Sequence, residues 1–260
     1  MTMMDWKTIT IPDLADKAVL ITGASTGIGA ALVRAFVAQG AKVAIHYNES
    51  RTAAEALSDE VGKDVTFLVQ GDVSQDGETE RVVEAAASHF GRLDGLVNNA
   101  GGMLGRVTTA EMTDAQYERV MNLNARSVLA ATRAAHPHLA RQGGFIINTT
   151  SIAARNGGGG GAILYAASKG FVSTITKGHA KEFTGDKIRV NGVAPGVITT
   201  PFHERYTSPE MLDAQRRTVP MARLGTPDEC VGAYLFLASE MLSGYVTGQI
   251  IEVNGGQLMP

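Results

Sequence analysis

The sequence predicts a single doubly wound α/β domain, in which a seven-stranded parallel sheet is flanked by helices on both faces. Short β-branched runs alternate with longer helical patterns along the whole chain, which is typical of βαβ units. The short runs are almost entirely apolar, as expected for strands that are covered on both sides. A length of 260 residues with 44% hydrophobic residues suits one large domain and is short for two.

Seven apolar runs are expected to form the strands, at residues 18–21, 43–47, 65–69, 93–97, 145–147, 188–193 and 249–253. Helices are expected between them, over residues 30–39, 53–60, 79–90, 113–141, 164–183 and 227–239. Right-handed crossovers through these helices would keep the strands parallel. We interpret residues 1–15 as an N-terminal extension and residues 16–260 as the domain. Residues 199–226 break the alternation and are expected to form a substrate loop.

Composition and charge exclude several classes of protein. The formal net charge is −3 at pH 7, whereas nucleic-acid-binding proteins carry a basic excess. The single cysteine, Cys230, excludes an intramolecular disulfide framework, fits a reducing compartment and gives no indication of a metal cluster. No run has the length of a membrane span, and the first residues lack the pattern of a secretory signal. We therefore expect a soluble cytoplasmic protein with no metal, membrane or nucleic-acid partner.

A glycine-rich segment joins the first predicted strand to the first predicted helix. Gly23, Gly27 and Gly29 are spaced as a tight turn that opens a helix requires. Backbone without side chains can approach a pyrophosphate closely there, and the free N–H groups of the helix N-terminus attract its charge. The segment predicts a dinucleotide site that also includes Ser25, Thr26 and Ile28.

The end of the second strand bears on the choice between NAD(H) and NADP(H). An acidic side chain there binds the ribose 2′-hydroxyl and repels a 2′-phosphate, but here the position carries Tyr47. Asn48, Ser50 and Arg51 follow and can donate hydrogen bonds to a phosphate, although Glu49 lies among them. Arg51 equally suits a solvated position at a helix start. We predict that NADP(H) is favoured over NAD(H).

Further polar or turn-forming segments follow other strands, at the edge where open α/β sheets bind ligands. Two of them come after the third and fourth strands, and a rigid turn closes the sixth. The cofactor-binding residues predicted in these segments are Asp72, Val73, Asn99, Ala100, Gly101, Pro195, Gly196, Val197, Ile198 and Thr200.

Tyr165 and Lys169 begin a predicted helix, and their i, i+4 spacing places both side chains on one face. A phenol with a reference pKa of about 10 is a poor acid or base at neutral pH until a nearby cation stabilises the phenolate. The pair thus predicts an acid/base that protonates an alkoxide as a reduced nicotinamide delivers hydride. An exposed surface pair is the structural alternative.

Two more polar residues are candidates for the same site. Ser151 follows the fifth strand, where its hydroxyl can hydrogen-bond the substrate oxygen as negative charge builds on it. Asn124 falls inside the long helix predicted at residues 113–141, where an amide ordinarily faces solvent. Facing inward, it would hold a water that connects Lys169 to bulk solvent.

Jointly these motifs resemble the short-chain dehydrogenase/reductase family, from about Asp16 to the C-terminus. The resemblance implies a Rossmann-like fold and a catalytic tetrad of Asn124, Ser151, Tyr165 and Lys169. It further assigns the three glycines to the phosphate turn, Asp72 and Val73 to adenine, residues 98–101 to a sheet-stabilising motif, and Pro195, Gly196 and Thr200 to the nicotinamide side.

The resemblance leaves undecided which residue has the serine role, and it also implies an oligomeric state. Ser151 is one residue further from Tyr165 than is usual in the family, which keeps Thr150 as an alternative for the serine role. The family's common homotetramer is also implied, with the Tyr165 helix and residues 231–237 at its interfaces.

The substrate is expected to contact residues 199–226 and the surroundings of the glycine run at residues 157–161. Arg106, Arg155 and His203 are the substrate candidates, because arginine binds carboxylates bidentately. The pattern looks similar to reductases of keto-deoxy uronates from alginate breakdown, such as 4-deoxy-L-erythro-5-hexoseulose uronate reductase. A 3-oxoacyl-thioester (acyl-carrier-protein) reductase and a sugar 1-dehydrogenase are alternatives. A catalytically silent, cofactor-sensing scaffold is the alternative outside the enzymes.

Overall fold

The computed structural model describes residues 6–260, apart from the side chains of residues 7 and 203–205. Seven parallel strands form one sheet in the order β3-β2-β1-β4-β5-β6-β7, which confirms the predicted fold class. The order reverses at β1, from which the chain winds outward in both directions. The strands are β1 (Ala18–Ile21), β2 (Lys42–Tyr47), β3 (Thr66–Gln70), β4 (Gly95–Asn98), β5 (Gly144–Thr149), β6 (Ile188–Pro195) and β7 (Ile250–Val253).

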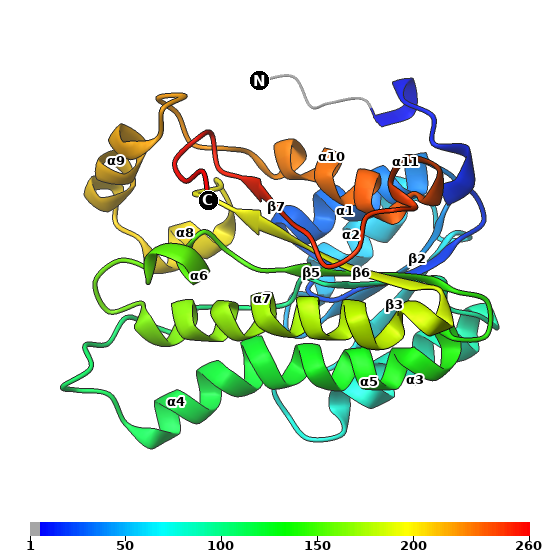
Figure 1. Cartoon of the computed structure of the whole chain (residues 1–260), viewed down its shortest axis with the longest axis horizontal. Helices are drawn as coiled ribbons and strands as arrows, with labels where there is room; N and C mark the ends of the chain where they lie inside the picture. Colours follow the sequence, from blue (N-terminus) through cyan, green and yellow to red (C-terminus); the bar gives the residue numbers. More distant parts are fainter. Residues whose placement is uncertain (1–5) are drawn as a thin grey trace.

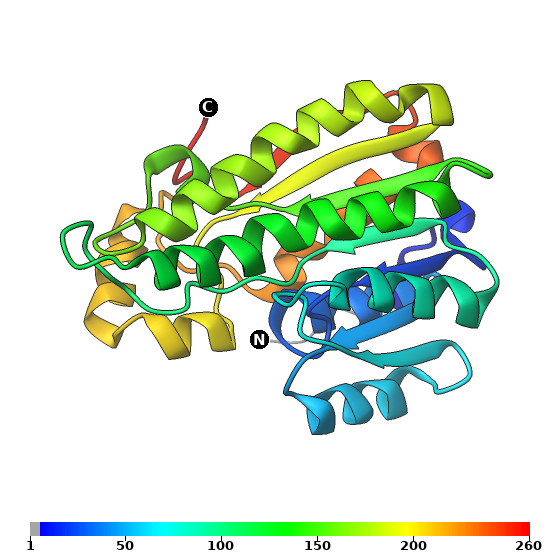
Figure 2. The same cartoon turned by 90° about the horizontal axis from the view of Figure 1, so that it is seen from below.

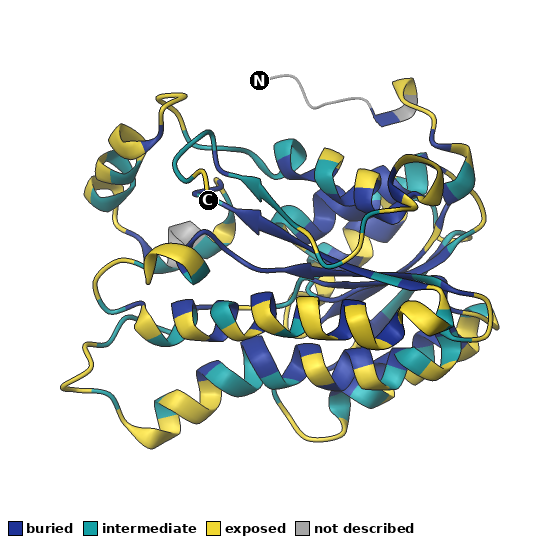
Figure 3. Ribbon diagram, viewed as in Figure 1, coloured by how far each residue is buried: buried dark blue, intermediate teal, exposed yellow. Residues whose placement is uncertain are grey.

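Helices cover the sheet in two layers (Figure 1). One layer contains α1 (Gly27–Ala38), α2 (Arg51–Val61) and α10 (Pro227–Ala238), whose apolar side chains form one core cluster with the strands. The other contains α3 (Glu78–Phe90), α5 (Ser127–Leu139) and α7 (Ile163–Phe183), which form the second cluster. Figure 2, seen from below, shows α5 and α7 running alongside one another in front of the strands. The central strands between the layers are buried, whereas the edge strand β7 is only partly so (Figure 3).

The described part of the predicted N-terminal extension packs on the domain. It contains two short 3₁₀ turns, at Trp6–Thr8 and Pro12–Leu14. Gln39, at the end of α1, donates to the carbonyl groups of residues 6 and 9 and accepts from the amide of residue 11. The Asp13 carboxylate accepts hydrogen bonds from Ser239 Oγ and the first amides of α11 (Glu240–Ser243). Residues 6–15 thus pack against the end of α1 and the start of α11.

The prediction that residues 199–226 form a loop is wrong in part, because two helices lie there. They are α8 (Pro201–Tyr206) and α9 (Pro209–Thr218). Proline at the first position of each helix supplies a fixed helical φ, and Ser208 caps α9 by accepting from Met211 N. Figure 1 shows α8 and α9 beyond the carboxyl ends of the central strands. The substrate region is therefore a pair of short helices rather than an irregular loop.

The long helix predicted at residues 113–141 contains an interruption. α4 (Asp114–Met121) passes into a π-helical turn at Asn122–Arg126 before α5 begins. A π-turn inserts one extra residue and rotates the side chains around it, and such turns are frequent at functional sites. The predicted helix is right in extent, but the pattern gave no sign of the π-turn.

Smaller differences lie at element ends. β5 and β6 extend further than predicted, which carries them to the edge where the polar segments lie. A one-turn helix, α6 (Ala153–Asn156), follows β5, and a 3₁₀ turn at Thr184–Asp186 follows α7. None of the helices in the described part of the chain combines the length and apolar character that a bilayer crossing needs.

Candidate active site

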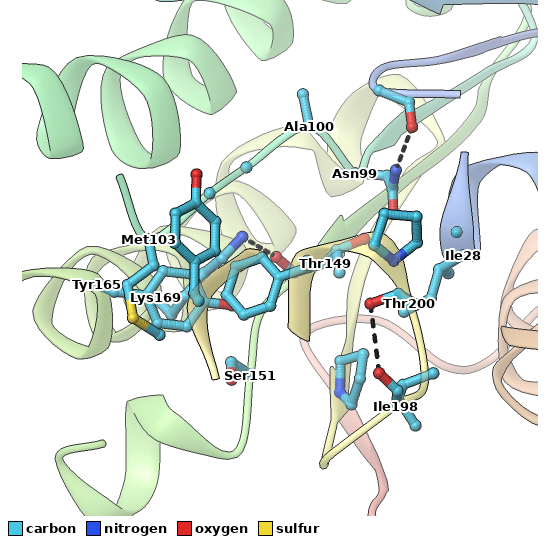
Figure 4. Close-up of a pocket in the computed structure, with 18 of the residues that line it drawn as sticks. Ile28, Asn99, Ala100, Met103, Thr149, Ser151, Tyr165, Lys169, Ile198 and Thr200 are labelled. Atoms are coloured by element: carbon cyan, nitrogen blue, oxygen red, sulfur yellow. Dashed lines mark hydrogen bonds between the residues drawn. The ribbon is translucent and has the colours of Figure 1, made fainter. Parts of the chain in front are cut away.

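One large cavity of about 670 Å³ opens at the carboxyl ends of the strands. This is the edge at which open α/β sheets bind ligands, and the volume is within the usual range for ligand pockets. Its walls come from the loops after β1 to β6, from α8 and α9, and from the C-terminal tail. Figure 4 shows part of this cavity, with Tyr165, Lys169 and Ser151 at one side and Ile28 and Asn99 at the other.

The predicted phosphate turn forms one end of the cavity. Gly23 and Gly27 have φ values of +61° and +56°, which glycine adopts without strain. A Cβ at Gly29 would lie 2.3 Å from the Gly23 carbonyl oxygen, so this position admits no side chain. Thr26 caps α1 without a side-chain hydrogen bond, which leaves the first amides of the helix available to an anion. The turn fits a pyrophosphate.

Two adjacent asparagines at the end of β4 hold this turn and the sheet. Asn99 Nδ2 donates to the carbonyl oxygens of Thr22 and Gly23, at 3.0 Å each (Figure 4). Asn98 Nδ2 donates to Asn148 Oδ1 at 2.9 Å and so ties β4 to β5. The side-chain amides of residues 98 and 99 thus bind other groups of the protein, and Asn99, Ala100 and Gly101 line the cavity.

The residues predicted to hold the ribose and adenine divide into two groups. Tyr47, Asn48, Ser50, Asp72 and Val73 line the cavity. Arg51 does not; its Nε donates to Tyr47 Oη at 3.3 Å, and its exposed guanidinium lies 3.6 Å from Glu55. The Asp72 carboxylate accepts from Ser74 N and Ser74 Oγ, which fixes the turn that carries Val73. Glu49 also lines the cavity at this end.

Tyr165 and Lys169 lie one turn apart at the start of α7. Lys169 is buried, and its Nζ donates to the Thr149 carbonyl oxygen at 2.8 Å (Figure 4). The same Nζ lies 5.9 Å from the centre of the Tyr165 ring. Tyr165 is half-buried, and its ring packs against Phe202 of α8 with a centroid distance of 5.5 Å. The pair faces the cavity, so the interpretation as an exposed surface pair is wrong.

Burial moves the pKa values of these two side chains in opposite directions. It raises the pKa of the Tyr165 hydroxyl, while a hydrogen bond with Ser151 lowers it. For Lys169, burial lowers the pKa to about 8. Both shifts arise because desolvation disfavours the charged form of each group. The lysine is therefore held near the point where it gains or loses its charge at physiological pH.

The structure distinguishes Ser151 from Thr150. Both residues line the cavity, and the Ser151 hydroxyl lies close enough to the Tyr165 hydroxyl to lower its pKa. The Thr150 hydroxyl points behind the site, where it donates to the Lys169 carbonyl oxygen at 3.1 Å and contacts Ser173 Oγ at 2.6 Å. The Ser151 hydroxyl thus lies beside Tyr165, whereas the Thr150 hydroxyl anchors the α7 backbone.

Asn124 lies in the π-turn and is fully buried. Its Oδ1 accepts from Gly102 N at 3.0 Å, and its Nδ2 donates to the carbonyl oxygens of Gly102 and Val120. A Cβ at Gly101 would lie 2.8 Å from Asn124 Oδ1 and 3.2 Å from Lys169 Nζ, so both side chains border the same glycine. Asn124 thus faces inward; one Nδ2 hydrogen binds the loop after β4 at Gly102, and the other binds Val120 in α4.

The segment after β6 lies across the cavity from these residues. Pro195, Gly196, Val197, Ile198 and Thr200 all line the cavity, as predicted for the nicotinamide side. The Thr200 hydroxyl donates to the Ile198 carbonyl oxygen (Figure 4), and its methyl group would lie 3.3 Å from a Cβ at Gly27. The phosphate turn and the segment after β6 thus approach one another at Gly27 and Thr200.

Of the two predicted substrate residues whose side chains the structure describes, Arg106 lies in the cavity wall and Arg155 does not. Its Nε donates to the Tyr206 carbonyl oxygen at 3.0 Å and its Nη1 to the Gly160 carbonyl oxygen at 2.9 Å. Arg155 lies outside the cavity lining, and its Nε is 3.4 Å from Glu252 Oε1. The backbone of His203 belongs to α8, but its side chain lies outside the described residues.

Several cavity residues were missed by sequence reasoning. Apolar, aromatic and amide side chains from the loop after β4, from α8 and α9 and from the C-terminal tail line the cavity, as does a histidine of β2; they are Met103, Leu104, Phe202, Tyr206, Gln215, Gln257 and His46. Among these residues, Phe202 and Tyr206 alone are spaced four apart, as two aromatic side chains on one face of a helix would be. The described residues contain no group of three or more His, Cys, Asp or Glu side chains placed to hold a metal ion.

Known proteins resemble this chain over most of its length. Residues 23–257 match a family model described as enoyl-(acyl carrier protein) reductase. The solved NADH-dependent reductase A1-R′ responsible for alginate metabolism is 39% identical with a TM-score of 0.88, and the match covers 96% of this chain and 100% of that one. A further structure of A1-R′ contains NAD.

Two curated relatives carry other activities in their names. The 3-oxoacyl-[acyl-carrier-protein] reductase of Synechocystis sp. is 36% identical over 95% of this chain and 98% of its own length. The chloroplastic NADPH-dependent aldehyde reductase 1 of Arabidopsis thaliana is 37% identical over 95% of this chain and 88% of its own length.

Proposed function

The chain belongs to the short-chain dehydrogenase/reductase family of NAD(P)-dependent oxidoreductases, and we propose that its carbonyl substrate is a small polar keto acid. A keto-deoxy uronate of the 4-deoxy-L-erythro-5-hexoseulose uronate type fits this description best. The observation that carries the proposal is the charge at the substrate end of the cavity. Two cations, Arg106 and Lys169, lie there, while the lining carboxylates, Glu49 and Asp72, come from the loops after β2 and β3.

The reaction follows from the positions of the side chains. In the direction of carbonyl reduction, the bound reduced nicotinamide supplies the hydride. The Tyr165 hydroxyl donates its proton to the alkoxide oxygen that forms, and the Ser151 hydroxyl donates a hydrogen bond to the same oxygen. The Lys169 ammonium stabilises the phenolate that remains. In the oxidation direction the phenolate takes up the alcohol proton.

Arg106 is suited to an anionic substrate because its charge is not neutralised. Its two hydrogen-bond partners are carbonyl oxygens, which fix the guanidinium without cancelling its charge. No carboxylate of the described residues forms an ion pair with it. A guanidinium held in this way is preorganised for a carboxylate.

A second candidate function is the reduction of a 3-oxoacyl thioester. The apolar wall formed by Met103, Leu104 and Phe202 favours it, since an acyl chain needs such a surface. The relative in Synechocystis sp. has this activity in its name. A sugar 1-dehydrogenase has no specific contact in its favour. Assays that follow oxidation of the reduced cofactor with the uronate and with an acetoacetyl thioester distinguish the two candidates.

We further propose that NADP(H) is the preferred cofactor. The end of β2 carries Tyr47 instead of a carboxylate, and the nearby Ser50 hydroxyl makes no helix-capping hydrogen bond. Arg51 is exposed and is held by a 3.3 Å hydrogen bond to Tyr47 Oη and a 3.6 Å contact with Glu55, so a short rearrangement at the surface would bring it to a 2′-phosphate. We expect Arg51→Ala to weaken NADP(H) binding about fivefold to tenfold, because one charge-assisted hydrogen bond is lost at an exposed site. Binding of NAD(H) should change by less than about twofold.

The measurement for this prediction is a titration of both reduced cofactors, followed by their fluorescence, against the wild type and Arg51→Ala. Arg141→Ala is the control. Arg141 is exposed and precedes β5, so it lies at the amino ends of the strands, away from the cavity at their carboxyl ends. Tighter binding of NAD(H) than NADP(H) by the wild type would contradict the proposed preference.

The lysine pKa predicts how carbonyl reduction depends on pH. Lys169 loses its positive charge as the pH rises through about 8, because burial has lowered its pKa from 10.5. The phenolate of Tyr165 then loses its stabilising cation, so kcat/KM for the carbonyl should fall above this pH by about tenfold per unit. Lys169→Arg keeps its charge in this range and should lose the decline. Values of kcat/KM that stay level up to pH 10 in the wild type would be incompatible with this role of Lys169.

The expected location and assembly complete the proposal. We propose a cytoplasmic enzyme, in keeping with the lone buried cysteine, Cys230. We also propose a homotetramer, because α7 exposes Ile163 and Phe171 and α10 exposes Phe236 on their outer faces. Apolar side chains on exposed helix faces suit contacts between subunits.

A further inference from the structure

His46, the next-to-last residue of β2, joins two loops of the cofactor site. Its side chain is buried and lies between the phosphate turn after β1 and the segment after β3. The ring Nδ1 accepts a hydrogen bond from Gly23 N at 3.0 Å, and Nε2 lies 3.0 Å from the Gly71 carbonyl oxygen. The ring also lines the cavity.

The two partners determine the protonation state of the ring. A backbone N–H only donates and a carbonyl oxygen only accepts, so Nδ1 carries no proton and Nε2 carries one. The imidazole is therefore neutral, in the Nε2–H tautomer. Burial lowers the pKa of His46 to about 4, which keeps the ring neutral at physiological pH.

The contacts of His46 hold the first residue of the phosphate turn in place. Gly23 has a positive φ, and its N–H is bound by the His46 ring while its carbonyl oxygen accepts from Asn99. The next amide, Ala24 N, donates to the His46 carbonyl oxygen at 2.8 Å. These contacts of Gly23 and Ala24 fix the start of the turn, and so they determine the direction in which the N–H groups of residues 25–28 point.

The second contact of the ring reaches the adenosine side. Gly71 directly precedes Asp72 and Val73, which line the cavity next to β2. A single imidazole thus fixes both the turn that fits the pyrophosphate and the segment predicted to meet adenine. No other described side chain hydrogen-bonds to the backbone of both Gly23 and Gly71.

We propose that His46 is a positioning residue for the dinucleotide cofactor, which couples the phosphate turn to the adenosine side of the site. It does not touch the reacting atoms. Its loss should weaken cofactor binding and leave the hydride-transfer step unchanged once the site is saturated. The inference concerns the cofactor and holds whichever carbonyl is the substrate.

Three substitutions separate the two contacts. His46→Leu removes both hydrogen bonds. His46→Asn places an acceptor near the Nδ1 position and keeps the bond from Gly23, whereas His46→Gln places a donor near the Nε2 position and keeps the bond to Gly71. For His46→Leu we expect binding of the reduced cofactor to weaken about 10- to 100-fold, because two backbone groups are left without partners. The other two variants should show smaller, separate losses.

The experiment measures the dissociation constants of the reduced cofactor and of ADP-ribose, together with kcat at saturating cofactor and the thermal midpoint of unfolding. ADP-ribose has the pyrophosphate and adenosine but no nicotinamide, so its affinity should fall by the same factor as that of the cofactor, with kcat within about twofold of wild type. His179→Leu is the control, because His179 is another buried histidine that lies outside the cavity lining.

Three results would overturn the inference. The first is an unchanged affinity for ADP-ribose in His46→Leu. The second is a decrease of kcat in step with affinity, which would place His46 in the chemical step. The third is an equal loss of affinity in His179→Leu at a similar loss of thermal stability, which would make the effect a general consequence of destabilisation. If His46→Leu does not fold, the Asn and Gln variants decide the question by the same measurements.

Discussion

Tyr165→Phe is expected to lower kcat by about 10²- to 10⁴-fold, the range that general acid–base catalysis supplies. The substitution removes the one hydroxyl that donates a proton to the alkoxide and leaves the ring packed against Phe202. Ser151 can still donate a hydrogen bond to the substrate oxygen, but its hydroxyl already accepts from Ala153 N and does not replace the phenol as the acid. Cofactor affinity should stay within about twofold of wild type, since the hydroxyl makes no contact with the phosphate turn.

The measurements are kcat at saturating substrate and the dissociation constant of the reduced cofactor. Tyr245→Phe is the matched control, because Tyr245 is fully exposed to solvent and lies far along the chain from the cavity residues. A Tyr165→Phe variant that keeps more than a tenth of the wild-type kcat would show that another group transfers the proton. If the wild type itself oxidised no reduced cofactor with any carbonyl, the result would favour a catalytically silent, cofactor-sensing scaffold.

Gly29→Ala is expected to weaken cofactor binding roughly 10- to 100-fold. The new Cβ would lie 2.3 Å from the Gly23 carbonyl oxygen and 2.8 Å from both Ala24 Cα and Asn99 Nδ2. The first two of these are backbone atoms, so the turn itself has to move. Overpacking of this kind costs about 1–3 kcal/mol, which corresponds to the stated loss if the displaced turn has to be restored on binding.

The measurement is a titration of reduced cofactor, with unfolding followed in parallel. Gly178→Ala in α7 is the control, since a Cβ there meets no atom within 4 Å. In that helix interior the change should raise stability by up to about 1 kcal/mol and leave binding unchanged. An unaltered cofactor affinity in Gly29→Ala would mean that the turn does not hold the phosphates.

The sheet was predictable because its signal is local. Each strand is a short apolar run, and both faces are covered, so the period of the pattern and the β-branched residues identify the strands without tertiary information. Strand ends were less certain, since β6 continues through Ala194 and Pro195 into a segment that reads as a turn. The helices α8 and α9 escaped notice because their apolar faces are short and their start signals lie among other turn-forming residues.

Site residues were predictable where chemistry dictates the residue type. Tyr165, Lys169 and the glycines of the phosphate turn carry such constraints, and the structure brings them to one cavity. Arg106 and Arg155 illustrate the limit, because the sequence does not show which partner a guanidinium takes. Arg155 faces Glu252, nearly a hundred residues along the chain, whereas Arg106 binds two backbone carbonyl groups.

His46 was missed for a related reason. A histidine at the end of an apolar strand reads as one more strand residue, and nothing nearby in the sequence marks its partners. Both hydrogen bonds go to backbone groups of glycines in separate loops, 23 and 25 residues away. Contacts of this kind appear only once the strand order brings the loops together.

We propose that this oxidoreductase selects an anionic keto acid through Arg106. The most direct test compares kcat/KM for a keto-deoxy uronate and for an acetoacetyl thioester, in the wild type and in Arg106→Met. Selectivity for the uronate should be tenfold or more in the wild type, about the contribution of a charge-assisted hydrogen bond, and should largely vanish in the variant. Preference for the thioester, or an equal loss with both substrates in Arg106→Met, would contradict the claim.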